Sequence, residues 1–362
     1  MRLQFLGAAA LDSGRRFEGT VVGGLSGITY DAARNRFYAV SDDPSLRSPA
    51  RFYTLTMELR DGRLGPGAVE VVAVTGLVDF DGKPFEKLAV DPEGIALAPG
   101  GTLWISSEGQ VERGIDPFVR EFRLDGRAVR ELSLPPGFRA LPGGRSGPRH
   151  NLALESVALS PDGSRLFTAT ENALVQDGPA ADLGVPSPVR LLRFDAASGR
   201  LEAAWRYQVE PIPAAPVPPE GFKLNGLVEL LALRETTLLA LERSYSAGVG
   251  NGARLYQVFL DEARESGAVD RLAEAPARDL PPARKELLLD LRQLGVRLDN
   301  LEGMTLGPEL SDGRRTLVLV SDDNFNHDLQ VTQFLAFAVV GEGDSDPVAG
   351  GARPAPAPSS PW

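Results

Sequence analysis

The chain has 362 residues, of which 43% are hydrophobic, so it can bury a large core in one all-β domain or two smaller ones. Its 38 Lys and Arg residues against 49 Asp and Glu residues give a formal net charge of -11, which argues against a nucleic-acid or anionic-membrane partner. With 0 cysteines, disulfides, thiolate metal sites and cysteine nucleophiles are excluded.

A strand over residues 3–11 is the first element that the sequence predicts, from the apolar run LQFLGAAAL. The longer stretch MRLQFLGAAALDSG has one early Arg and no clear cleavage site, so we interpret it as part of the fold, with a trimmed signal peptide as the alternative. No apolar run in the sequence is long enough to span a bilayer, and we therefore expect no membrane span.

Five later segments share one pattern, in which two strand-like runs are joined by a short turn. They are LSGITYDAARNRFYAVSDD from Leu25, PEGIALAPGGTLWISSEG from Pro92, LESVALSPDGSRLFTATEN from Leu154, VELLALRETTLLALERS from Val228 and NLEGMTLGPELSDGRRTLVLVSDDNFN from Asn300. The second positions, when aligned, are Ser26, Glu93, Glu155, Glu229 and Glu302. The interval between them is too long for a solenoid repeat.

Each repeat continues with two further strand-like runs, such as RFYTLTMEL and VEVVAV in the first. The fifth has TQFLAFAVV but no fourth run, and residues 3–11 would supply it. Four antiparallel strands per repeat and closure into a ring predict an all-β β-propeller of five four-stranded blades, whose N-terminal strand completes the last blade. Six blades are the alternative, because long connections could hold further strands: 77–90, 135–151, 172–189 and 211–224.

We expect the propeller to be a single domain over residues 1–340. The remaining residues, 341–362, are rich in Gly, Pro and Ala, a composition that buries little apolar surface. They are predicted to form a disordered tail.

Carboxylates recur at corresponding places in the repeats. In an antiparallel hairpin the start of the first strand and the end of the second lie at the same edge, so the acids at these two places face the same way. The predicted pairs are Ser26 with Asp42, Glu93 with Glu108, Glu155 with Glu171, Glu229 with Glu242, and Glu302 with Asp322. Because the first strand of each blade lines the axis, these acids should converge on one tunnel mouth and require a cation there.

Two sources of positive charge are expected. The third strands begin with Arg51, Arg120, Arg190 and Arg254, which we expect to pair with the acids that end the second strands, Glu108, Glu171 and Glu242. The inner acids lack a repeated partner and are expected to bind a metal ion: Glu93, Glu155, Glu229 and Glu302, with Asp42 and Asp322 helping. A ligand set of oxygen atoms alone suits Ca²⁺, with Mg²⁺ as the second choice.

Residues found in one blade only are the catalytic candidates. Arg149 and His150 precede Glu155, and Arg243 follows Glu242. The two arginines would hold an anionic group such as a phosphate, with a surface or structural role as the alternative. Any imidazole acid or base must be His150 or His327, the 2 histidines of the chain.

Several familiar catalytic motifs are absent from the sequence. It has no G-x-S-x-G, no G-x-x-x-x-G-K-[ST] and no H-E-x-x-H. This excludes the serine hydrolases, P-loop enzymes and zinc proteases that carry those motifs, and leaves carboxylate and metal chemistry.

The motifs GGLSGITYD, FYAVSDD, DPEGIAL, LWISSEG, FVREF, LESVALSPDGSRLFTATEN and NLEGMTLG resemble the phytase-like domain family, described as having esterase-like activity of phytase. The resemblance runs from about Leu3 to Val340 and implies a bacterial hydrolase of ester or phosphoester bonds, often exported to the periplasm or secreted. The chain lacks the dense Lys and Arg field expected for a highly phosphorylated inositol, which argues against phytate itself as the substrate.

The leading hypothesis is a monomeric, metal-dependent hydrolase of small phosphoesters or carboxylic esters, with its site at one tunnel mouth. Ca²⁺ on the inner acids would polarise the substrate, Arg149 and Arg243 would stabilise negative charge, and His150 or a spare carboxylate would transfer the proton. One alternative is a lactonase-type propeller, for which Asn225 and Asn300 would join the metal ligands. The other is a non-enzymatic binding propeller with a structural metal.

Overall fold

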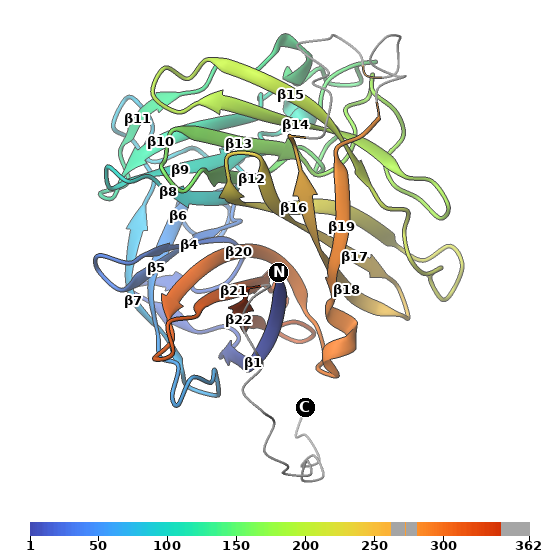
Figure 1. Ribbon diagram of the computed structural model, residues 1–362. Coiled ribbons are helices and arrows are strands. Elements are labelled where there is room, and N and C mark those ends of the chain that lie inside the picture. The colour runs from blue at the N-terminus through green and yellow to red at the C-terminus, as the bar shows by residue number, and fades with distance from the viewer. Residues whose placement is uncertain (262–271, 273–280, 342–362) are drawn as a thin grey trace.

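Five four-stranded antiparallel sheets surround a central axis in the computed structural model, which describes residues 1–261, 272 and 281–341 (Figure 1). Blade one contains β4 (Leu25–Asp31), β5 (Arg36–Ser41), β6 (Arg51–Met57) and β7 (Val69–Gly76). Blade two contains β8 (Pro92–Leu97), β9 (Thr102–Ser107), β10 (Phe118–Arg123) and β11 (Ala128–Glu131). Blade three contains β12 (Leu154–Leu159), β13 (Arg165–Thr170), β14 (Ser187–Asp195) and β15 (Leu201–Val209).

Blade four contains β16 (Lys223–Arg234), β17 (Thr237–Ser246), β18 (Gly250–Phe259) and β19 (Arg284–Asp290). Blade five contains β20 (Asn300–Glu309), β21 (Arg315–Asp322), β22 (Thr332–Val340) and β1 (Arg2–Leu11). Outside the blades lie a short hairpin of β2 (Arg16–Phe17) and β3 (Thr20–Val21) and the 3₁₀ turns η1 (Val111–Arg113), η2 (Pro136–Phe138) and η4 (Leu291–Leu294). The five-blade prediction is therefore confirmed, and the four connections that were candidates for a sixth blade hold no further sheet.

The N-terminal strand closes the ring as predicted. β1 pairs antiparallel with β22 from Arg2 opposite Val340 to Leu11 opposite Thr332. A bulge interrupts the pairing before Gly7, where the carbonyl oxygen of Leu64 approaches so closely that a Cβ would lie 2.2 Å from it. Glycine at this position, with φ of +126°, allows β1 to lie against the connection between β6 and β7.

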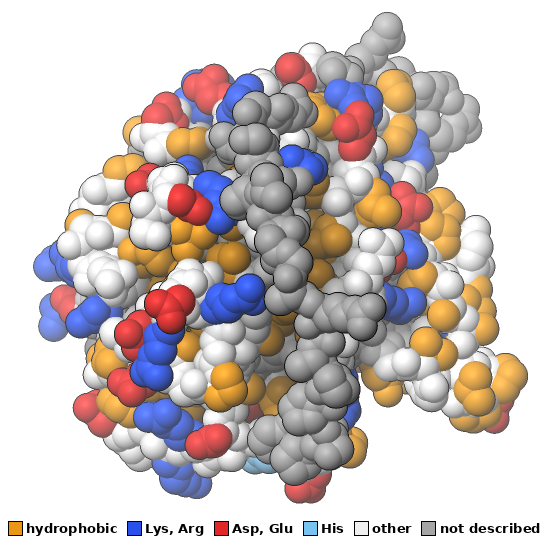
Figure 2. Space-filling view, turned by 60° about the horizontal axis from the view of Figure 1, so that its bottom comes forward, with side chains coloured by type: hydrophobic (Ala, Val, Ile, Leu, Met, Phe, Trp, Pro, Cys, Tyr) orange, Lys and Arg blue, Asp and Glu red, His pale blue; other side chains and the backbone are white. Residues whose placement is uncertain are grey.

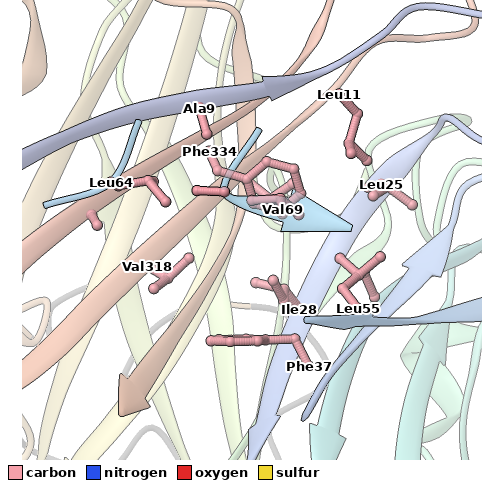
Figure 3. Close-up of a cluster of buried hydrophobic side chains, with 14 of the residues drawn as sticks. Ala9, Leu11, Leu25, Ile28, Phe37, Leu55, Leu64, Val69, Val318 and Phe334 are labelled. Carbon is pink, nitrogen blue, oxygen red and sulfur yellow. The ribbon is translucent and has the colours of Figure 1, made fainter. Parts of the chain in front are cut away.

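The core beside β1 joins the last blade to the first. Figure 3 shows Ala9 and Leu11 of β1 packed with side chains of blades five and one, and the same residues belong to one buried cluster. The other labelled members are Leu25, Ile28, Phe37, Leu55, Leu64, Val69, Val318 and Phe334. Alternate residues of each strand point into such layers, as the apolar periodicity of the sequence predicts. Closure therefore depends on side-chain packing as well as on backbone pairing.

The inner strands β4, β8, β12, β16 and β20 contact one another around the axis (Figure 1). On the face of the molecule that Figure 2 shows, acidic and basic side chains are interspersed. No helix within the described residues is long and apolar enough to cross a membrane. Except for Gly341, the predicted tail lies outside the described residues.

Candidate metal and anion site at the tunnel mouth

A bulge near the start of each inner strand positions the side chains of the site. The pairing of each inner hairpin skips at this point, which turns the extra residue out of the ladder. The residues at the bulges are Ser26, Glu93, Glu155, Val228 and Glu302. Three of the predicted inner acids therefore share one structural position, and blade four departs from the pattern.

In blade four the sequence alignment was wrong by one residue. Leu227 pairs with Glu242 and Glu229 pairs with Leu241, so the bulge falls on Val228 and not on Glu229. Glu242 then occupies the place of a small hydroxyl residue in the other blades: Ser41, Ser107, Thr170 and Ser321. Arg243 consequently takes the place that is acidic in every other blade: Asp42, Glu108, Glu171 and Asp322.

Glu229 lies at the junction of blades four and five instead of in the cavity. Its carboxylate accepts the N–H of Leu230 at 2.9 Å, and a backbone hydrogen bond from Met304 of β20 also stabilises its charged form. Burial nevertheless raises the pKa of Glu229 well above its ordinary value. The corresponding residues are glycine in blades one, two and five, namely Gly27, Gly94 and Gly303. There the neighbouring inner strand approaches too closely for a side chain.

Asp42, Asp91 and Glu93 form the group best suited to hold a metal ion. One carboxylate oxygen of each lies within 4.8 Å of the others, and Asp91 and Glu93 are buried. Gln110 Nε2 donates to Asp91 Oδ2 at 2.7 Å and orients it. We refer to these three residues as the acid trio. Asp91 was not predicted, although the motif DPEG places a second acid beside Glu93 in this blade alone.

Electrostatics within the acid trio favours a bound cation. Burial raises the pKa of Asp91 to about 6, against which its hydrogen bonds with Asp42 and Gln110 act. Burial and neighbouring carboxylates raise the pKa values of Asp42 and Glu93 well above their ordinary range. Charged carboxylates at this spacing repel one another, and a divalent ion with oxygen ligands would relieve that repulsion.

A second group of buried acids surrounds Arg243. Its Nη2 donates to Glu302 Oε1 at 2.8 Å and lies 3.6 Å from Glu171 Oε1. Asn300 Nδ2 donates to the same oxygen of Glu302 at 2.9 Å. Glu171 reaches this position because Gly226 has no side chain: a Cβ there would be 2.1 Å from Glu171 Oε1. The guanidinium of Arg243 thus supplies a fixed positive charge to the acids in this half of the tunnel mouth.

Arg243 does not fully neutralise these acids. Burial raises the pKa of Glu171 to about 7 although Arg243 lowers it, and the same opposition leaves the pKa of Glu302 raised. Burial alone would lower the pKa of Arg243, but Glu302, Glu171 and Glu155 raise it above its ordinary value. Glu171 Oε1 and Arg243 Nε are buried without a hydrogen-bond partner. One buried acceptor and one buried donor therefore lack a hydrogen-bond partner in this half of the tunnel mouth.

A cavity of about 940 Å³ opens onto both groups. Its inner end is lined by Asp42, Glu93, Glu155, Arg243, Asn300, Glu302 and Asp322. It extends outward along residues of blade four and of the segment that leads into blade five. The structure thus brings together every predicted metal ligand except Glu229 around one cavity.

The other two catalytic candidates lie differently. Arg149 Nε donates to the carbonyl of Ala173 at 3.0 Å and Nη2 to that of Gly178 at 2.7 Å. Arg149 therefore ties two backbone segments together, and it is not among the cavity-lining residues. His150 is exposed but lies near enough to Asp91 for its positive charge to lower the pKa of that carboxyl.

The predicted ion pairs of the third strands were wrong in partner. The observed pairs are Arg51 with Asp43, Arg120 with Asp79 and Glu131, Arg190 with Asp177, and Arg254 with Asp290. Glu242 instead accepts hydrogen bonds from Lys285 and Tyr207. Glu108 accepts the N–H of Ala153 in the next blade and Glu171 lies beside Arg243, whereas the arginines reach acids supplied by loops and outer strands.

Comparison with protein families gives one match: the phytase-like model, described as esterase-like activity of phytase, covers residues 20–325. No curated protein matches. Among solved structures, a hypothetical protein from Leishmania major has a TM-score of 0.44 at 9% identity, covering 94% of this chain and 92% of that one. An alpha-L-arabinofuranosidase from Lactobacillus brevis has a TM-score of 0.44 at 8% identity, covering 89% and 92%. Similarity at this level carries no argument about activity.

Proposed function

Because the chain belongs to the phytase-like family, described as having esterase-like activity of phytase, we propose that it is a metal-dependent hydrolase of phosphoester or carboxylic ester bonds. The acid trio, two of whose members, Asp42 and Glu93, line the cavity, is the observation that carries this proposal. Its all-oxygen donor set fits Ca²⁺, and Mg²⁺ as the second choice. When bound, such an ion polarises an ester oxygen and lowers the pKa of a coordinated water.

The residues of the chain would bind and orient the substrate beside the acid trio. Arg243 lines the cavity and is held by Glu302, so its remaining N–H groups are fixed in direction. They would donate to an anionic oxygen of the substrate as its negative charge increases. The position of Arg149 outside the cavity supports assigning this role to Arg243 alone. A fixed donor loses little order when the substrate binds.

Proton transfer is assigned to His150 or to a carboxyl group of the mouth. His150 is exposed, its neighbour Asn151 lines the cavity, and it is close enough to Asp91 to influence that carboxyl electrostatically. Glu155 lines the cavity between the two acid groups, and burial raises its pKa well above its ordinary value. A carboxyl with a raised pKa can hold a proton near neutral pH and donate it to a leaving group.

Metal analysis and hydrolysis assays test the proposal together. We expect purified protein to bind Ca²⁺ and to hydrolyse p-nitrophenyl phosphate or p-nitrophenyl esters, with loss of activity in chelator and recovery with Ca²⁺. Asp91→Asn should weaken metal binding, whereas Asp79→Asn, at the partly exposed Arg120 pair, should not. Full activity in metal-free protein would contradict the proposal.

A lactonase-type reaction is the second candidate, and Asn300 favours it. This residue pairs with Asp322 across the hairpin and donates to Glu302, which puts one Glu, one Asn and one Asp together. Asn225 is less suited, because its Nδ2 donates to the carbonyl of Glu210 and to Glu242. Hydrolysis of a simple γ-lactone, but not of p-nitrophenyl phosphate, would favour this candidate. Metal binding with no hydrolysis of either would support a binding propeller.

A further inference from the structure

The outer part of the cavity differs in chemistry from its acidic inner end. Apolar and aromatic side chains line it from blade four, from the segment leading into blade five and from the β21–β22 connection: Phe222, Leu224, Tyr245, Val249, Val296 and Leu329. Phe222 is 66% exposed and Leu329 is 69% exposed. Large apolar side chains that stay exposed around a cavity mark a surface that a ligand can cover.

The aromatic part of this wall is held in place by the backbone. The rings of Phe222 and Tyr245 lie 6.0 Å apart at an interplanar angle of 36°. The carbonyl of Phe222 accepts the N–H of Ala247 at 2.9 Å, and the carbonyl of Ala247 accepts the N–H of Val217 at 2.7 Å. The loop before β16 is thus fastened to the β17–β18 turn. The ring of Phe222 is exposed although its backbone is anchored.

Two exposed arginines line the same outer region. Arg292 Nη2 donates to Ser244 Oγ at 3.5 Å, and Arg297 Nη2 donates to the carbonyl of Leu329 at 3.5 Å. Within the described part of the chain, neither forms an ion pair with a carboxylate. A chain with a net charge of -11 therefore places two exposed arginines, outside the ion pairs of its described residues, in the outer part of this cavity. Such charge attracts anions and raises their local concentration.

We propose that the substrate is an anionic ester with an aromatic or comparably apolar group, which lies against Phe222 and Tyr245 while the ester faces the acid trio. This inference rests on the proposed function and specifies its substrate class. The cavity volume of about 940 Å³ lies within the range of small-molecule sites, which combine apolar walls with a few polar groups. A polyphosphorylated polyol would leave the apolar wall in contact with water, so the wall disfavours it.

Binding of two unreactive phosphonates tests the substrate class without requiring turnover. Benzylphosphonate carries the ring that the wall would bind, methylphosphonate lacks it, and both present the same anionic group. By calorimetry in Ca²⁺, wild-type protein should bind benzylphosphonate about tenfold more tightly or better, from burial of the ring. Phe222→Ala should abolish most of this preference. Phe80→Ala, at a ring that is 54% exposed, is covered by Arg120 and does not line the cavity, should retain it.

Each outcome decides the inference. Equal affinity for the two phosphonates in wild type, or an unchanged preference in folded Phe222→Ala, would overturn the apolar subsite while leaving metal-dependent hydrolysis in place. If neither phosphonate binds and no ester is hydrolysed, the proposed function fails and the inference fails with it. Thermal melting checks that each variant is folded. Leu329→Ser, at an exposed residue that lines the same cavity, gives a second test if Phe222→Ala does not fold.

Discussion

Replacing Arg243 with methionine removes the guanidinium that lies between Glu302 and Glu171 while keeping a long, apolar side chain in the same space. Glu302 loses an ion pair of 2.8 Å and Glu171 loses a cation at 3.6 Å. Removal of one partner from a buried pair costs about 3–5 kcal/mol of the free energy of unfolding. We therefore expect Arg243→Met to be strongly destabilising at neutral pH when no divalent cation is present.

The loss should depend on pH, and its direction follows from the buried acids. Arg243 lowers the pKa values of both Glu302 and Glu171, so its removal raises them further. A carboxyl whose pKa is higher in the folded state than in the unfolded state binds more protons when folded. Its contribution is therefore lost as pH rises from the unfolded value near 4.5 through the folded value, at about 1.4 kcal/mol for each pKa unit. The destabilisation should be larger at pH 8 than at pH 5.

Urea unfolding of wild type and variants at pH 5 and pH 8, in EDTA, measures this difference. Arg254→Met is the matched control, because it removes an arginine from the neighbouring strand whose pair with Asp290 is only partly buried, at 33% and 19% exposure. The control should lose about 1 kcal/mol or less at both pH values. Equal losses for Arg243→Met at the two pH values, or a loss no larger than the control, would refute the reasoning.

Other parts of the structure lead to further expectations. Deleting residues 1–12 should cost several kcal/mol, because it exposes the edge of β22 and the apolar layer of Figure 3; unchanged melting would contradict ring closure by β1. Chelation should lower the melting temperature and added Ca²⁺ should restore it, because Ca²⁺ at a hundredfold excess over Kd adds about 2.7 kcal/mol to the free energy of unfolding. Arg190→Ala should destabilise by about 3–5 kcal/mol, since Asp177 is buried, and Arg120→Ala by much less; equal losses in urea unfolding would contradict this.

The blade architecture could be predicted because each repeat carries it independently. Alternating apolar residues, turn residues and acids at strand ends occur in all five repeats, so an ambiguous one is corrected by the others. The pairing of residues 3–11 with the last blade followed from a strand that was missing there. The structure bears out this logic over the full length of β1.

The site was harder to predict in blade four, where a shift of one residue changes which side chain enters the tunnel. The sequence offered Glu229 and Glu242 as acids that matched those of other blades. The bulge lies at Val228 instead, so Glu229 turns to the junction with β20 and Arg243 enters the mouth. Because side chains alternate along a strand, the position of a bulge decides their direction, and residue types alone do not reveal it.

The sequence pattern also did not predict ion-pair and metal-site partners that come from irregular loops. Arg190 pairs with Asp177, which follows β13 in an irregular connection, while the repeated acid Glu171 lies nearer in the pattern but faces inward. Asp91 joins the acid trio through a motif that occurs in one blade only. Comparing the repeats reveals the residues that occur in every blade. Asp177 and Asp91 each occur in one blade only, so that comparison does not find them.

Ring closure by β1 also constrains how the protein is made. Leu11 pairs with Thr332, so β1 leaves the ribosome long before its partner strand exists. Throughout that interval its backbone lacks the pairing with β22 and its apolar side chains lack their contacts with blade five, so four blades can form before this strand is paired. Such a distant pairing slows folding and leaves an exposed edge during translation. Chaperone capture of β1 during synthesis, and domain-swapped dimers in which β1 completes a neighbouring ring, are the consequences to look for during production of this protein.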